Sequence, residues 1–225
     1  MNFKNIIIAT ASILIAASAA GQTKDWANFG RYRQQNEEVA GQKINAVFMG
    51  NSITDNWARM HPDFFSDHGF VGRGISGQTT SEMLVRFRRD VLDLKPEAVA
   101  ILAGINDIAQ NNGEISIENT FGNIVSMCEL AKAHKIKVIL CSVLPCDRLS
   151  WRPSIQPAEK VKRLNAMLKE YAAENRILFV DYWTPMANEN GGLDKEISKD
   201  GCHPTIEGYR IMEDIFLETT KKFRW

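Results

Sequence analysis

The chain has 225 residues, of which 44% are hydrophobic and 24% are charged, a composition typical of a folded globular protein. Lys plus Arg and Asp plus Glu both number 27, so the formal net charge is zero. A neutral chain lacks the excess of basic residues that favours binding to nucleic acid or to an anionic membrane surface, and we expect neither partner.

The first 20 residues have the three regions of a secretory signal peptide. Lys4 supplies a positive charge, residues 6–17 form an apolar run, and residues 18–20 (SAA) offer small side chains where a signal peptidase cleaves. The apolar run is shorter than the roughly 20 residues that a membrane span needs, and no cysteine follows it to accept a lipid. We therefore predict export to the periplasm or the extracellular space, no stable membrane anchor, and a single domain over residues 21–225.

Apolar runs alternate with helical spacings along the rest of the chain. A first helix is predicted over residues 26–39. Strands are predicted at residues 44–49, 70–75, 98–103, 138–143 and 177–180, and further helices around Trp57 and at residues 79–94, 116–134, 157–174 and 205–222. This alternation predicts an α/β fold, a three-layer α/β/α sandwich with a parallel sheet of about five strands. Residues 84–89, which include three arginines, are interpreted as a solvated helix face.

Four polar segments interrupt this pattern. They are GNSIT at 50–54, RGISG at 73–77, GIND at 104–107 and DGCHP at 200–204. Three of them follow predicted strands, and the fourth precedes the last helix. Because ligands of open α/β sheets bind beyond the carboxyl ends of the strands, we expect these segments to form one site.

The residue types in these segments match the needs of acyl transfer, which are a nucleophile, a base and a group that orients the base. Ser52 follows a strand directly, and Gly50 permits the tight turn that would expose its hydroxyl. His203 is the best base, because an imidazole, with an ordinary pKa of about 6.5, can take and return a proton at neutral pH. Asp200 lies three residues earlier and can fold back to hold Nδ1 of His203.

The developing oxyanion needs donors as well. The backbone N–H groups of Ser52 and Gly77 and the side-chain amide of Asn106 are the candidates. In order and residue type, the four segments resemble blocks I, II, III and V of the SGNH hydrolases, also called GDSL-type lipases and esterases. The resemblance implies a flavodoxin-like fold, ester hydrolysis through an acyl-enzyme, and no cofactor or metal. It assigns Ser52, Asp200 and His203 as catalytic residues and Ser52, Gly77 and Asn106 as the oxyanion hole.

Three further residues are candidates for substrate contact. Asn51 stands where block I usually has Asp, which removes a charge beside the nucleophile. Trp151 and Arg152 lie in a long loop after the fourth predicted strand, where substrate contacts are common. Export, the lack of an apolar lid and the resemblance together favour removal of small acyl groups, acetyl in particular, from a small-molecule or glycan ester.

Other functions fit the same segments. A lysophospholipase or thioesterase would use the same residues on a longer acyl chain. A catalytically silent carbohydrate-binding protein could share the fold, since fold does not determine function, and a flavodoxin-like cofactor binder would retain a flavin.

The four cysteines do not match the spacing of a zinc site. They are Cys128, Cys141, Cys146 and Cys202. Both disulfides and free thiols are compatible with an exported chain. Cys202 is an alternative nucleophile beside His203, although side chains adjacent in sequence usually point apart.

Overall fold

The computed structural model describes residues 25–223, so the predicted signal peptide lies outside the described residues. Five parallel strands form one sheet in the order β2-β1-β3-β4-β5. Their bounds are β1 (Ala46–Gly50), β2 (Phe70–Gly74), β3 (Ala98–Leu102), β4 (Lys137–Cys141) and β5 (Leu178–Val180). Every residue of the central strands β1 and β3 is buried, as expected for strands covered on both faces.

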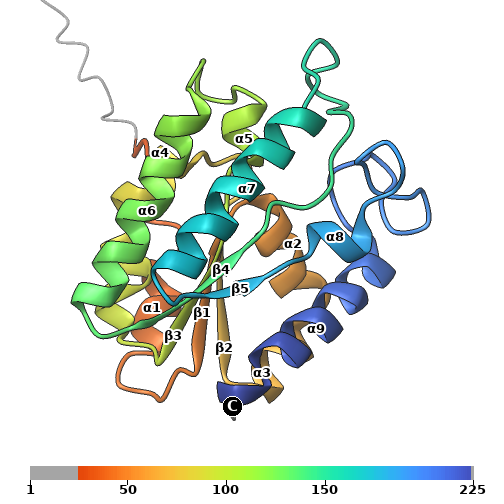
Figure 1. Cartoon of the computed structure of the whole chain (residues 1–225). Coiled ribbons are helices and arrows are strands. Elements are labelled where there is room, and N and C mark those ends of the chain that lie inside the picture. The colour runs from red at the N-terminus through yellow and green to blue at the C-terminus, as the bar shows by residue number, and fades with distance from the viewer. Residues whose placement is uncertain (1–24, 224–225) are drawn as a thin grey trace, which may run out of the picture.

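Helices cover both faces of the sheet, which confirms the predicted three-layer α/β fold (Figure 1). Figure 1 shows α4 (Thr80–Asp90), α6 (Ile117–Ala133) and α7 (Ala158–Glu174) on one side of the strands, and α2 (Ser52–Met60), α3 (Pro62–Asp67) and α9 (Ile206–Thr220) on the other. The shorter helices are α1 (Arg33–Glu38), α5 (Ile105–Ile108), α8 (Trp183–Met186) and two 3-10 turns at Leu92–Leu94 and Lys221–Phe223.

An aromatic cluster joins the sheet to the layer formed by α2, α3 and α9. Phe48 of β1 lies at its centre, with its ring 5.4 Å from that of Trp57 on α2 and 4.8 Å from that of Phe216 on α9. Trp57 also stacks on Tyr209 of α9, whose hydroxyl donates to the carbonyl of Ile53 at 2.8 Å. Because α2 begins at the first polar segment and α9 follows the fourth, this packing sets how these segments lie relative to each other.

The predicted helix over residues 26–39 is wrong in its first half, since only Arg33–Glu38 is an α-helix. The carboxylate of Asp25 accepts the backbone N–H groups of Phe29 and Gly30, both at 2.9 Å. Asn28 has a positive φ of 55°, which no α-helix tolerates. A side chain that satisfies these N–H groups stabilises a series of turns in place of the helix.

The interpretation of residues 84–89 as a solvated face is also wrong for two of the six residues. Arg86 and Phe87 are completely buried, because α4 packs between the sheet and α6, whereas Arg88 and Arg89 are exposed. Nη2 of Arg86 donates to the carbonyls of Gly50 and Arg73, both at 3.0 Å, at the ends of β1 and β2. A buried arginine therefore holds together the strand ends that lead into the first two polar segments.

Candidate active site

Ser52 is the first residue of α2, directly after the turn that ends β1. A Cβ atom at Gly50 would lie 2.0 Å from Oγ1 of Thr54, so only glycine fits this turn. The side chain of Asn51 caps the helix, since its Oδ1 accepts the N–H of Ile53 at 3.1 Å. The N–H of Ser52 thus belongs to the positive end of a helix of nine residues, where a developing negative charge is stabilised.

This cap does not support the prediction that Asn51 contacts substrate. The side chain is only 1% exposed and its oxygen is engaged by the helix, so it has no surface to offer a ligand. Both asparagine and aspartate present an acceptor oxygen, which explains why Asn can stand where the SGNH pattern has Asp.

Ser52, His203 and Asp200 form a continuous hydrogen-bonded line. Oγ of Ser52 lies 2.8 Å from Nε2 of His203, and Nδ1 of His203 lies 2.6 Å from Oδ2 of Asp200. The other carboxylate oxygen of Asp200 accepts the backbone N–H groups of Cys202 at 2.9 Å and His203 at 2.8 Å. This arrangement can place the imidazole proton on Nδ1 and leave Nε2 free to accept the proton of Ser52.

The carboxyl group of Asp200 is suited to an ionised role. Partial burial works to raise its pKa, but hydrogen bonds from the backbone and side chain of His203 and from the backbone of Cys202 hold the pKa below its ordinary value. Asp200 is therefore an anion at neutral pH and can stabilise an imidazolium on His203.

The three predicted oxyanion donors come from three different segments. Gly77 is exposed with a positive φ of 82°, and no atom lies within 4 Å of where a Cβ would be. Among residues 25–223, the N–H groups of Ser52 and Gly77 have no hydrogen-bond acceptor. Nδ2 of Asn106 donates to the carbonyl of Gln78 at 2.9 Å, which anchors this buried amide beside the Gly77 loop, and it has a second hydrogen to offer.

Trp151 lies beside His203, with ring centroids 5.8 Å apart, and is 37% exposed. Its Nε1 donates to Oδ1 of Asn111 at 3.2 Å. Arg152 is exposed, and its guanidinium has no hydrogen-bond or ion-pair partner within the described part of the chain. The structure thus brings Trp151 to the site, whereas Arg152 remains a candidate on exposure alone.

All four cysteines are buried free thiols. Cys202 is 2% exposed, and its thiol hydrogen-bonds with that of Cys146. This hydrogen bond and burial raise the pKa of Cys202 well above its ordinary value. A protonated, buried thiol is a poor nucleophile, which favours Ser52 over the alternative that the sequence left open.

Asp107, next to Asn106, holds the start of α4. Its carboxylate accepts the N–H of Thr80 at 3.0 and 3.1 Å and the hydroxyl of Thr80 at 2.5 Å. Burial raises the pKa of Asp107 to about 6, although the hydrogen bonds from Thr80 oppose this shift.

Asp107 should therefore make folding stability depend on pH. Because its folded pKa lies above the ordinary value of 3.8, the folded state binds this proton more tightly, and protonation stabilises it. Between pH 8 and pH 5, the free energy of unfolding of the wild type should rise relative to that of Asp107→Asn by roughly 1 kcal/mol. Urea denaturation of both proteins at several pH values measures this difference, and parallel pH profiles would contradict it.

The sequence analysis missed two features that support the site, the side chain of Gln78 and the ion pair between Arg86 and Asp90. Oε1 of Gln78 accepts Nε of Arg86 at 2.5 Å, and Nη1 of Arg86 pairs with Asp90 at 2.9 Å. The i, i+4 spacing of Arg86 and Asp90 was a visible signal of this ion pair. Nothing in the sequence marks Gln78, whose role arises only from its position between α4 and the Asn106 loop.

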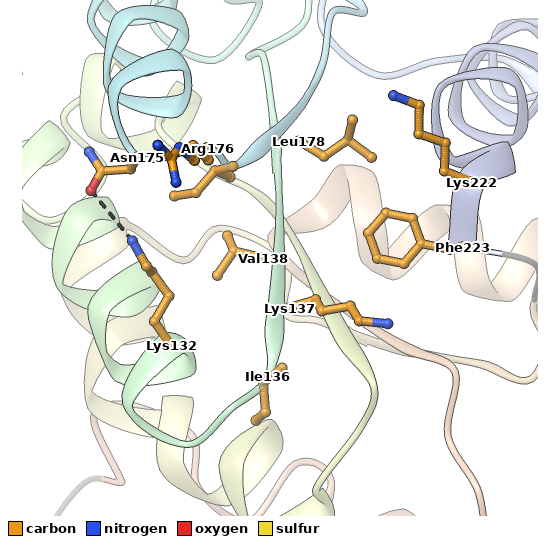
Figure 2. A pocket seen from close by; sticks show the side chains of 10 residues that line it. Lys132, Ile136, Lys137, Val138, Asn175, Arg176, Leu178, Lys222 and Phe223 are labelled. Carbon is orange, nitrogen blue, oxygen red and sulfur yellow. Dashed lines mark hydrogen bonds between the residues drawn. The ribbon is translucent and has the colours of Figure 1, made fainter.

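Two cavities lie away from this site. One of about 480 Å³ lies at the amino ends of β4 and β5, at the opposite edge of the sheet from Ser52, where Lys132, Lys137 and Lys222 surround apolar side chains (Figure 2). Another of about 530 Å³ lies between α3 and α9. Within residues 25–223, no group of three or more His, Cys, Asp or Glu side chains could hold a metal ion.

Comparisons with known proteins agree with the resemblance of the four segments. The sequence model of the GDSL-like Lipase/Acylhydrolase family matches residues 48–211. The structure is similar to that of a GDSL-like lipase from Bacteroides thetaiotaomicron, with a TM-score of 0.84 and 50% identity over 87% of this chain and 98% of the lipase. Curated relatives include Esterase TesA of Pseudomonas aeruginosa, 24% identical over 79% of this chain and 84% of the esterase. The acetylxylan esterase of Geobacillus stearothermophilus is 23% identical over 83% of this chain and 96% of that enzyme.

Proposed function

Because this chain belongs to the GDSL-like lipase/acylhydrolase family of the SGNH hydrolases and is a carboxylic ester hydrolase, we propose that it removes small acyl groups, acetyl in particular, from carbohydrate esters. The observation that carries the proposed mechanism is the line of hydrogen bonds from Ser52 through His203 to Asp200. It is the arrangement that forms an acyl-enzyme on a serine.

In the first half of the proposed reaction, Oγ of Ser52 attacks the ester carbonyl while Nε2 of His203 takes the hydroxyl proton. Asp200 stabilises the imidazolium that results. The oxyanion receives hydrogen bonds from the N–H groups of Ser52 and Gly77 and from the amide of Asn106. When the intermediate collapses, the bond to the alcohol oxygen breaks and His203 gives its proton to the departing alcohol.

In the second half, a water molecule attacks the acyl-enzyme. His203 takes a proton from this water, the same donors hold the second oxyanion, and the proton returns to Oγ of Ser52 as the acid leaves. The cycle consumes one water and one ester, and it releases one carboxylic acid and one alcohol.

Two observations support a small acyl group and a carbohydrate alcohol. The exposed ring of Trp151 beside His203 gives the departing alcohol a flat apolar surface of the kind on which a sugar ring can stack. The similarity to an acetylxylan esterase over 83% of the chain points to the same combination of acyl group and alcohol.

We also propose that the protein is exported, with residues 1–20 as a cleaved signal peptide and residues 21–225 as one hydrolase domain. The order of charged, apolar and small residues at the amino terminus supports this. No helix within residues 25–223 combines the length and the apolar character that a membrane crossing needs.

A series of p-nitrophenyl esters, supplemented by an acetylated xylooligosaccharide, tests the proposed substrate. We expect kcat/KM for the acetate to exceed that for the octanoate by at least about tenfold, because a small acyl pocket rejects extra methylenes. Acetate should also be released from the oligosaccharide. A preference for octanoate would favour the lysophospholipase or thioesterase alternative, and a lack of Ser52-dependent hydrolysis would favour a silent binding protein.

A further inference from the structure

Asn111 lies between Trp151 and the loop that contains Gly77, here called the oxyanion loop, and its side chain hydrogen-bonds to both. Its Oδ1 accepts the indole N–H of Trp151 at 3.2 Å, and its Nδ2 donates to the carbonyl of Gly77 at 3.0 Å. Its own backbone N–H donates to the carbonyl of Asn106 at 3.0 Å. One residue thus contacts the surface beside His203 and two of the three segments that supply oxyanion donors.

The backbone around Asn111 is shaped for this position. Gln110, at the end of the turn after α5, has a positive φ of 57°, and its N–H donates to the carbonyl of Asp107 at 2.9 Å. This left-handed residue turns the chain back toward the Gly77 loop, where Asn111 is partly buried. A non-glycine residue with this φ is uncommon and marks a position that the surrounding structure determines.

Trp151 depends on Asn111 for its orientation. The loop that carries it is anchored by the buried side chain of Leu149, whose carbonyl accepts the N–H of Arg152 at 3.0 Å. Within residues 25–223, the one hydrogen-bond partner of the indole N–H is Asn111. The ring is therefore held at its edge by Asn111 while its neighbour His203 lies 5.8 Å away between centroids.

The chemistry of this bridge requires an amide. Trp151 offers only a donor and the Gly77 carbonyl only an acceptor, so the residue between them must supply one acceptor and one donor. An aspartate at position 111 would accept from the indole but would set its second oxygen against the carbonyl of Gly77. An alanine would satisfy neither group.

We propose that Asn111 is a positioning residue that couples binding of the alcohol part of the ester to the oxyanion loop. A sugar ring stacked on Trp151 fixes the indole, the indole fixes the amide of Asn111, and the amide holds the Gly77 loop in the position that receives the oxyanion. Binding energy from a part of the substrate remote from the reacting carbonyl is thereby used in the transition state. The alcohol, in addition to the acyl group, then determines turnover. This inference rests on the proposed carbohydrate esterase function.

A double-mutant cycle with two substrates tests the coupling. Trp151→Phe keeps a ring for stacking but removes the indole N–H, and Asn111→Ala removes the bridge. Acetylated xylobiose supplies a sugar alcohol, and ethyl acetate supplies an alcohol too small to stack. The matched control is Asn112→Ala, an exposed neighbour whose side chain makes only a 3.5 Å hydrogen bond to Thr79.

We expect Trp151→Phe to lower kcat for acetylated xylobiose by about tenfold and kcat for ethyl acetate by much less, since only the sugar ester stacks on the ring that the bridge holds. In the Asn111→Ala background, Trp151→Phe should have no further effect on kcat, because its partner is already absent. Thermal melting of each variant shows whether it is folded, and Asn112→Ala should behave as the wild type with both substrates.

Two outcomes would overturn the coupling. If the effects of the two substitutions on kcat multiply, or if Trp151→Phe changes only KM, Trp151 and Asn111 act independently and Trp151 is a binding surface alone. If the wild type hydrolyses ethyl acetate but releases no acetate from xylobiose, the carbohydrate substrate itself is wrong, and the coupling is refuted with it. Activity of the wild type on xylobiose therefore separates the failure of the coupling from the failure of the proposed function.

Discussion

Replacing Ser52 by alanine is expected to lower kcat/KM for p-nitrophenyl acetate by about 10⁴-fold or more, the loss typical of removing a serine nucleophile. The Oγ atom lies 2.8 Å from Nε2 of His203, and within residues 25–223 no other hydroxyl hydrogen-bonds to this imidazole. The side chain is partly exposed and small, so the melting temperature should stay close to that of the wild type. Steady-state kinetics and a thermal melt of the same preparation measure both effects.

The matched control is Ser66→Ala, an exposed serine on α3 that should leave activity unchanged. Cys202→Ala distinguishes the two possible nucleophiles beside His203. If Cys202→Ala abolished hydrolysis while Ser52→Ala retained most of it, the assignment of Ser52 would be refuted. A burst of p-nitrophenol equal to the enzyme concentration, present in the wild type and absent in Ser52→Ala, would provide direct support for the acyl-enzyme.

The positions of the strands and the edge at which the polar segments gather were predictable because they follow from local patterns. Runs such as residues 98–103 are apolar throughout, which indicates strands buried on both faces, and parallel strands place their following loops at one edge. The contact between Ser52 and His203 joins residues 151 positions apart. No periodicity predicts this contact. We expected it because acyl transfer needs a base beside the nucleophile and because the four segments resemble those of the SGNH hydrolases.

Other features depend on tertiary partners that local patterns do not contain. Asn51 was a candidate for substrate contact, yet its side chain is buried, because it supplies the acceptor that the N-terminus of α2 needs. Asn111 stands in an unremarkable polar loop, and its partners Gly77 and Trp151 lie 34 and 40 positions away along the chain. Such residues become recognisable only when the groups that they satisfy are in place.

Arg86 is another residue whose role depends on tertiary partners, and replacing it has the largest expected effect on stability. Binary patterning treats arginine as a surface residue, so an inward-facing arginine contradicts the helical pattern. Its burial is possible because the carbonyls at the ends of β1 and β2, the side chain of Gln78 and the carboxylate of Asp90 together accept its donors. None of these acceptors except Asp90 can be inferred from the sequence of α4 itself.

Replacing Arg86 by methionine should therefore reduce the free energy of unfolding by about 3–5 kcal/mol, because Asp90 keeps a buried charge that has lost its cationic partner. Methionine fills much of the volume, so the loss reflects the unpaired acceptors more than a cavity. Urea denaturation measures the effect. The control is Arg88→Met on the exposed side of the same helix, which should change stability by no more than about 0.5 kcal/mol.

The double variant Arg86→Met/Asp90→Leu separates the stability lost through the unpaired charge of Asp90 from the stability lost through the carbonyls that lack a donor. Removing both charges should restore part of the lost stability, since a buried ion pair replaced by apolar side chains is often tolerated. Restoration should remain partial, because the carbonyls of Gly50 and Arg73 still lack their donor. Equal stability of Arg86→Met and Arg88→Met would refute the role of Arg86. Full recovery in the double variant would show that the ion pair alone matters, and that the strand ends leading to Ser52 and Gly77 hold their positions without Arg86.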